Sequence, residues 1–69
     1  MATAELLARL KPLFASHQVG AVLVLLETGE ILPFWCEADA FDWADEKAMR
    51  HGTYSVISSQ TYASIEDIL

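Results

Sequence analysis

The hydrophobic residues near the start of this chain recur with the period of a helix. Between Leu6 and His17, six side chains fall within an arc of roughly 120° on a helical wheel. They are Leu6, Leu7, Leu10, Leu13, Phe14 and His17. Thr3 can cap this helix, and Glu5 suits its first turn. Pro12 lies on the polar side, and because it lacks an N–H it predicts a kink within one helix.

The pattern then changes to two extended segments joined by a turn. Ala21–Leu26 is apolar at every position, which predicts a strand buried on both faces. Glu27–Glu30 supplies a turn in which Gly29 can take a positive φ, and Ile31–Cys36 predicts the returning strand of a β-hairpin. Pro33 cannot donate a ladder hydrogen bond, so this strand should be an edge or be bulged. The hairpin needs two covers: the first helix for one face, and a later helix or a second copy for the other.

The rest of the chain predicts a helix, a strand and a short final helix. Asp39 or Asp42 can cap a helix that runs to about His51. Residues 53–59 are rich in β-branched and aromatic types, which favours a third strand, and residues 61–69 return to helical spacing. The expected fold class is therefore α+β, a small antiparallel sheet built on the hairpin with helices packed on it, in the order α-β-β-α-β-α.

Length and composition indicate one domain over residues 1–69 with a thin margin of stability. The chain is 54% hydrophobic, which is more apolar surface than so small a domain can bury. Cys36 is the only cysteine, so no internal disulfide can form. With His17 and His51 it offers too few ligands for a structural zinc. We therefore expect no cofactor, and a partner subunit in its place, most simply in a homodimer.

Charge narrows the class of partner. Ten acidic and four basic residues give a formal net charge of −6. Direct binding of nucleic acid requires a basic patch and is not expected, whereas a basic protein surface is the natural complement. We find neither a signal peptide nor an apolar run long enough to span a bilayer. A lone cysteine fits a reducing compartment, so the sequence predicts a cytoplasmic protein without membrane contact.

The tryptophans and an acidic series are the candidate partner-binding residues. On the expected helix, Phe41 shares the inward side with Ala44 and Ala48, whereas Trp43 lies outward among charged residues, which is the composition of an interface hot spot. If the helix rolls, Trp43 joins the core instead. Trp35 and its neighbour Phe34 should point to opposite faces of their strand. The residues expected to bind a partner are Trp35, Trp43, Glu37, Asp39, Asp42, Glu46 and Tyr54.

Several of these residues also have plain structural explanations. The acidic residues suit a helix N-terminus and a solvated face. Cys36 could act as a nucleophile if a histidine activated it, but it follows an apolar strand and is expected to be structural. No two histidines stand at the spacing of a helical metal site. We predict no catalytic and no metal-binding residue.

The turn carries one short motif. Glu27-Thr28-Gly29-Glu30, followed by Ile31-Leu32-Pro33, resembles the hairpin peptide by which an oxidative-stress transcription factor docks to a Kelch-propeller adaptor. The resemblance covers four to seven residues, and the same tetrapeptide is an ordinary hairpin turn. No function is assigned from it.

These patterns favour a small, non-enzymatic interaction protein. It would be of the inhibitor, antitoxin, immunity or adaptor kind, as phage and mobile-element products often are, and would act as a homodimer that occludes a partner surface. One alternative is a DNA mimic, which requires carboxylates in a dense, elongated row. Another is a small enzyme that uses Cys36 at a dimer interface.

Overall fold

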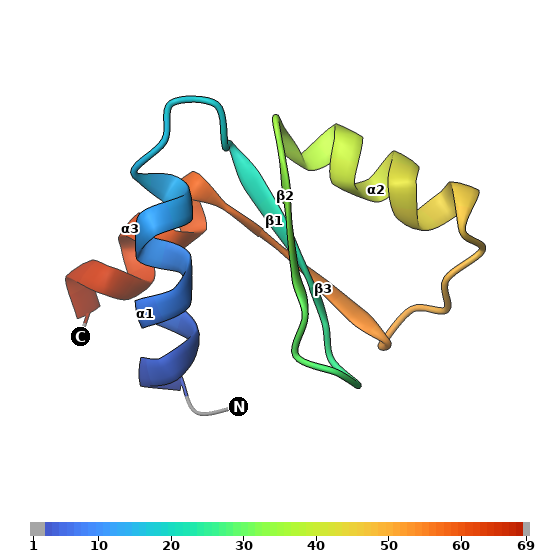
Figure 1. Cartoon of the computed structure of the whole chain (residues 1–69), viewed down its shortest axis with the longest axis horizontal. Helices are drawn as coiled ribbons and strands as arrows, with labels where there is room; N and C mark the ends of the chain where they lie inside the picture. Colours follow the sequence, from blue (N-terminus) through green and yellow to red (C-terminus); the bar gives the residue numbers. More distant parts are fainter. Residues whose placement is uncertain (1–2, 69) are drawn as a thin grey trace.

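The chain forms three layers, with a small sheet between helices (Figure 1). The structure, a computed structural model, describes residues 3–68. In chain order the elements are α1 (Thr3–Phe14), β1 (Ala21–Leu25), β2 (Ile31–Phe34), α2 (Glu37–Glu46), β3 (Tyr54–Ser58) and α3 (Ser59–Ile68). The predicted α+β class and the order α-β-β-α-β-α are confirmed. No helix of residues 3–68 has the length and apolar character needed to cross a membrane.

The sheet is antiparallel with the strand order β2-β1-β3. The predicted hairpin is confirmed: Leu23 of β1 lies opposite Leu32 of β2, and Gly29 in the connecting turn has φ 75°. Pro33 is on an edge strand, as expected, because only the central β1 has partners on both sides. Helices cover both faces of the sheet at β1, which explains why every residue of this strand is apolar.

Each face of the sheet has its own hydrophobic cluster. α1 and α3 lie on one side and α2 on the other (Figure 1). The first cluster contains the buried residues Leu10, Val22 and Val24, with Phe14, Ile57 and Tyr62 among those packed against them. The second contains Leu23, Ala40 and Ala44, with Phe34, Trp43, Tyr54 and Val56 among those around them. A later helix, rather than a second copy, therefore supplies the second cover.

α1 is one helix with Pro12 exposed in its last turn. The apolar part of the predicted stripe is confirmed, since its leucines and Phe14 are buried or half-buried. The placement of His17 on that stripe is wrong: the helix ends at Phe14, and His17 is exposed in the following turn. At this end the Ser16 N–H donates to the Leu13 carbonyl at 3.2 Å, a three-residue bond of the kind that closes a helix. The predicted cap relies on the Thr3 side chain, which lies outside the described part of the chain, as does Leu69 in the predicted last helix.

α2 begins and ends earlier than its sequence pattern predicts. Its N-cap is Cys36, in extended backbone and without a side-chain cap bond, so the expected caps Asp39 and Asp42 lie inside the helix. The prediction that it reaches His51 is also wrong, because α2 stops at Glu46.

Ala48 explains this early stop. It has φ 52°, a left-handed conformation that favours glycine. Its N–H donates to the Asp45 carbonyl and the Met49 N–H donates to the Ala44 carbonyl, both at 3.0 Å. These two bonds form a Schellman motif, in which the left-handed residue is usually glycine. The helix therefore ends where these two hydrogen bonds satisfy its last carbonyl groups, although the left-handed position is occupied by alanine instead of glycine.

Replacing Ala48 with glycine is expected to stabilise the fold. Relief of the left-handed strain outweighs the greater freedom of glycine in the unfolded chain, for a net gain of about 0.5–1 kcal/mol. Urea unfolding followed by circular dichroism measures the change. The matched control is Ala63→Gly in the exposed interior of α3, which should lose about 1 kcal/mol. Equal losses in both variants would contradict this account of Ala48.

Candidate functional site

The outward side of α2 carries the densest charge in the molecule. Ala40 and Ala44 are fully buried against the sheet, so the opposite side of the helix faces solvent. All five carboxylates of the helix are exposed. We call them the acidic face of α2: Glu37, Asp39, Asp42, Asp45 and Glu46. All four acidic residues predicted to bind a partner therefore lie on this one helix.

Phe41 lies among these carboxylates and is 45% exposed. The prediction that it shares the inward side of the helix with Ala44 is wrong. Because α2 starts at Glu37, the sheet instead receives Ala40 and Ala44, one turn apart. Small residues there let the helix approach β1 closely, which leaves the large Phe41 ring outside. Ala48, the third residue placed inward, is exposed beyond the end of the helix.

Trp35 is the most exposed of the large hydrophobic residues whose side chains the structure describes, at 66%. It lies in the bend between β2 and α2 rather than in the strand predicted to extend to Cys36. Its backbone is held by Gly20, whose N–H donates to the Phe34 carbonyl at 3.0 Å. A Cβ added to Gly20 would overlap the Trp35 carbonyl oxygen and lie 3.3 Å from its carbonyl carbon. The close contact between Gly20 and the Trp35 backbone therefore fixes where the chain leaves β2 and where α2 begins.

Trp43 lies at the boundary between core and surface. It is half-buried and packs against the α2-side cluster. Its ring centroid is 6.1 Å from that of Phe34, with the planes tilted by 58°, which is a favourable aromatic pair geometry. The Lys47 Nζ lies over the Trp43 ring, 5.9 Å from its centroid. Trp43 was expected either to face outward as a hot spot or to join the core. The structure packs most of its ring against the core.

The structure does not bring Tyr54 together with Trp35. Tyr54 is opposite Leu25 at one end of β1, and Trp35 follows Phe34, which is opposite Ala21 at the other end. At about 3.3 Å per residue these ends are roughly 13 Å apart along the strand. Tyr54 is half-buried in the α2-side cluster, so a surface centred on Trp35 and the acidic face does not include it.

Cys36 is half-buried at the N-terminus of α2, not deep within a strand. His17 follows α1, and His51 precedes β3. Across residues 3–68, no group of three or more His, Cys, Asp or Glu side chains is placed to hold a metal ion.

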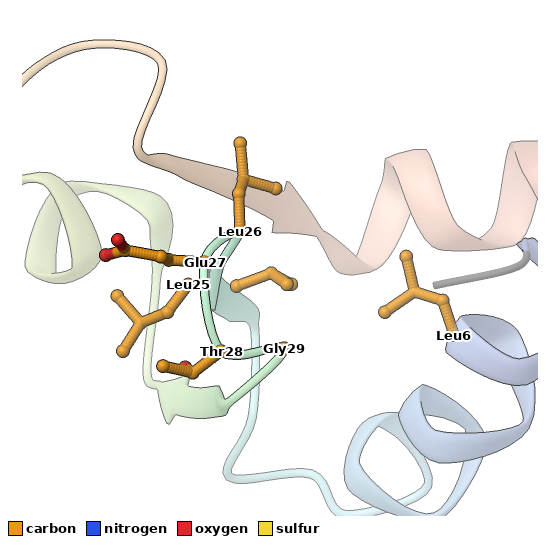
Figure 2. Close-up of a pocket in the computed structure, with 7 residues that line it drawn as sticks. Leu6, Leu25, Leu26, Glu27, Thr28 and Gly29 are labelled. Carbon is orange, nitrogen blue, oxygen red and sulfur yellow. The ribbon is translucent and has the colours of Figure 1, made fainter.

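An apolar pocket of about 350 Å³ lies between α1 and the hairpin turn. Figure 2 shows Leu6 on α1 across this pocket from the turn residues. The Arg9 guanidinium bridges the two elements by donating to the Gly29 carbonyl at 3.0 Å. Leu26 at the rim is 55% exposed. Glu27 is the only charged residue among those lining the pocket, so the pocket offers few polar groups to orient a ligand.

One ionisable group in the first cluster has a shifted pKa. A hydrogen bond with Glu66, one turn along α3, raises the pKa of Tyr62 above its ordinary value, and desolvation and the charge of Glu66 act in the same direction. The Tyr62 ring stacks on Phe14 with centroids 4.9 Å apart. This arrangement joins α3 to α1 through stacked aromatic rings.

Comparison of the chain with known protein families, with curated proteins and with solved structures finds no match. Functional conclusions therefore rest on the geometry described above.

Proposed function

We propose that this chain is a small, non-enzymatic protein-binding module that occludes a basic partner surface and acts as a homodimer. The observation that carries the proposal is the combination of exposed aromatics and carboxylates around α2. Phe41 and Trp35 are 45% and 66% exposed, and the acidic face surrounds Phe41. Interface hot spots combine an aromatic anchor with a polar rim, and carboxylates speed the approach of a basic partner. The module would be of the inhibitor, antitoxin, immunity or adaptor kind.

The single chain buries few of its own apolar side chains, which supports a need for a partner. Only seven hydrophobic residues of the described chain are buried, and three of them are alanines. The other buried side chains are Leu10, Val22, Leu23 and Val24. Most of the remaining large apolar residues are half-buried, so further burial is available at an interface.

The distribution of charge favours a protein partner over DNA mimicry. A mimic needs one elongated row of carboxylates, spaced as densely as DNA phosphates. Here five acids lie on α2, while Glu5 is on α1, Glu27 and Glu30 flank the hairpin turn, and the last two acids are on α3. These elements lie on both sides of the sheet (Figure 1). We therefore assign the interaction to α2 and the adjoining Trp35.

The test compares which proteins are captured by matched baits. Tagged wild-type chain and a Trp35→Ala/Phe41→Ala variant are used to purify partners from cells of the source organism. We expect the variant to lose a protein that wild type retains. The Kd of the variant for that purified partner should be about 30-fold or more above the wild-type Kd, as for loss of a hot spot. Thermal melting should change little because both side chains are exposed.

Leu26→Ala is the control, since it removes another exposed large side chain, one that lines the pocket beside α1. It should bind like wild type. Asp42→Asn/Asp45→Asn should slow association and reduce its dependence on salt while leaving dissociation nearly unchanged. Equal binding by wild type and the Trp35→Ala/Phe41→Ala variant would rule out this surface.

A further inference from the structure

The two edges of the sheet differ in their hydrogen-bonding capacity. The Leu25 N–H donates to the Glu30 carbonyl at 2.8 Å, and the Leu26 N–H donates to the Thr53 carbonyl at 3.1 Å. Bonds alternate along antiparallel strands. Odd-numbered residues of β1 therefore bond to β2, and even-numbered residues bond to β3. By the same alternation, Pro33 on β2 directs its backbone away from β1, toward the open edge.

Pro33 closes the β2 edge. It has no N–H to offer to another strand, and its ring occupies the space where such a strand would lie. The same orientation explains why proline is tolerated in β2, because its nitrogen faces away from the ladder with β1. Proline on an edge strand is a known means of preventing edge-to-edge association.

The β3 edge has no comparable protection. Tyr54–Ser58 contains no proline, glycine or charged residue. The alternation places the backbone groups of Tyr54 and Val56 on the open edge. At its far end, the Ser58 Oγ accepts a hydrogen bond from the Thr61 N–H at 3.1 Å and so caps α3. An unprotected strand of this kind is a template for pairing with another strand.

Charge favours a second copy of this chain as the pairing strand. The net charge of −6 opposes self-association over most of the surface. Between Glu46 and Glu66, however, the sequence contains no acidic residue, and it carries Lys47 and Arg50. β3 lies within this segment. Two copies can therefore meet along β3 without bringing carboxylates of the paired strands together.

The shape of the molecule provides room for such contact. Its extents are 33 × 25 × 16 Å, and the view down the shortest axis shows the strands overlapping one behind another (Figure 1). The sheet edges therefore lie on the two broad sides of the molecule. A rectangle of 33 × 25 Å bounds each broad side, which is of the same order as the roughly 800 Å² that each partner commonly contributes to a stable interface.

We propose that β3 pairs antiparallel with β3 of a second copy, about a two-fold axis at Val56. The Val56 N–H of each copy donates to the Val56 carbonyl of the other, and Tyr54 lies opposite Ser58. The two three-stranded sheets then form one sheet of six strands, closed at both outer edges by Pro33. The two-fold axis is perpendicular to the sheet, so both copies of α2 lie on the same face. If the proposed function holds, this dimer presents two acidic faces to one partner.

The test measures oligomeric state and amide exchange together. Light scattering over about a hundredfold range of concentration should show a dimer that dissociates on dilution. In wild type, hydrogen exchange at the Tyr54 and Val56 amides should slow as the dimer forms. Val56→Pro removes the outward N–H without removing a bond to β1, so it should give a folded monomer. Val56→Ala loses comparable side-chain packing but keeps the N–H, and it should still dimerise.

A second variant covers the case in which Val56→Pro does not fold. Ser55→Lys places a charge on the exposed edge and should also yield a monomer, whereas Ser64→Lys, at an exposed serine of α3, should remain dimeric. Wild type that is monomeric at every concentration would overturn the proposal. So would a dimer that persists in Ser55→Lys with unprotected Tyr54 and Val56 amides, or a dimer lost in Trp35→Ala/Phe41→Ala instead. None of these readouts requires the α2 partner, so the β3 dimer and partner binding through α2 can fail separately.

Discussion

Alanine at Gly20 is expected to lower the free energy of unfolding by about 3 kcal/mol or more. The added Cβ would overlap the Trp35 carbonyl oxygen, and this neighbour is backbone that cannot rotate away. Gly20 is also fixed on both sides: its N–H donates to Phe34, and its carbonyl accepts from the Ser59 N–H at 2.9 Å. Relief of the overlap would therefore disturb the junctions of β2 with α2 and of β3 with α3 together. Urea unfolding monitored by circular dichroism measures the loss.

Gly52→Ala is the matched control for Gly20→Ala. Gly52 has φ 91°, so alanine there is strained, but nothing lies within 4 Å of the added Cβ. Its expected loss is about 1–2 kcal/mol. If Gly20→Ala proved no more destabilising than Gly52→Ala, the close approach at Trp35 would not be what requires glycine.

Leu23→Ala is expected to remove about 2–5 kcal/mol of stability, as for other buried leucines. Leu23 is fully buried at the centre of β1, in the cluster under α2. Two of its neighbours there are Ala40 and Ala44, whose short side chains cannot extend to fill the cavity. Small domains have total stabilities of only about 5–15 kcal/mol, so this one substitution threatens the whole fold.

Leu26→Ala serves as the control because it deletes the same atoms three residues along the chain from a side chain that is 55% exposed. It should change the free energy of unfolding by about 0.5 kcal/mol or less. All variants must be compared at one protein concentration, since a dimer couples stability to concentration. Similar losses for the two leucines would contradict the two-sided burial of β1.

The candidate site was only partly predictable from sequence. The aromatic and acidic composition around α2 was evident, and Trp35 is exposed as a surface residue should be. The orientation of α2 was not predictable, because it depends on where the helix starts. Helical spacing on a helix started by Asp39 or Asp42 placed Phe41 on the inward side with Ala44 and Ala48. In the folded chain the inward positions belong to Ala40 and Ala44, since only small residues allow the helix to lie close to β1.

The sequence alone determined the elements and their order, because these depend on local causes. Hydrophobic period distinguishes the helix of residues 6–14 from the strand that begins at Ala21, Gly29 permits the hairpin turn, and Pro33 excludes a central position for β2. Each of these signals acts over a few residues of chain and requires no knowledge of what packs nearby.

Only the tertiary structure decided which helix covers which face, where α2 ends and which edge stays open. The end of α2 at Glu46, just before the left-handed Ala48, depends on hydrogen bonds that outweigh the local preference for glycine at position 48. The need for glycine at position 20 arises from a carbonyl fifteen residues away. The open edge at β3 exists because Ile57 and its neighbours pair with β1 on one side only. Such features depend on contacts between distant residues, and these exist only once the chain has folded.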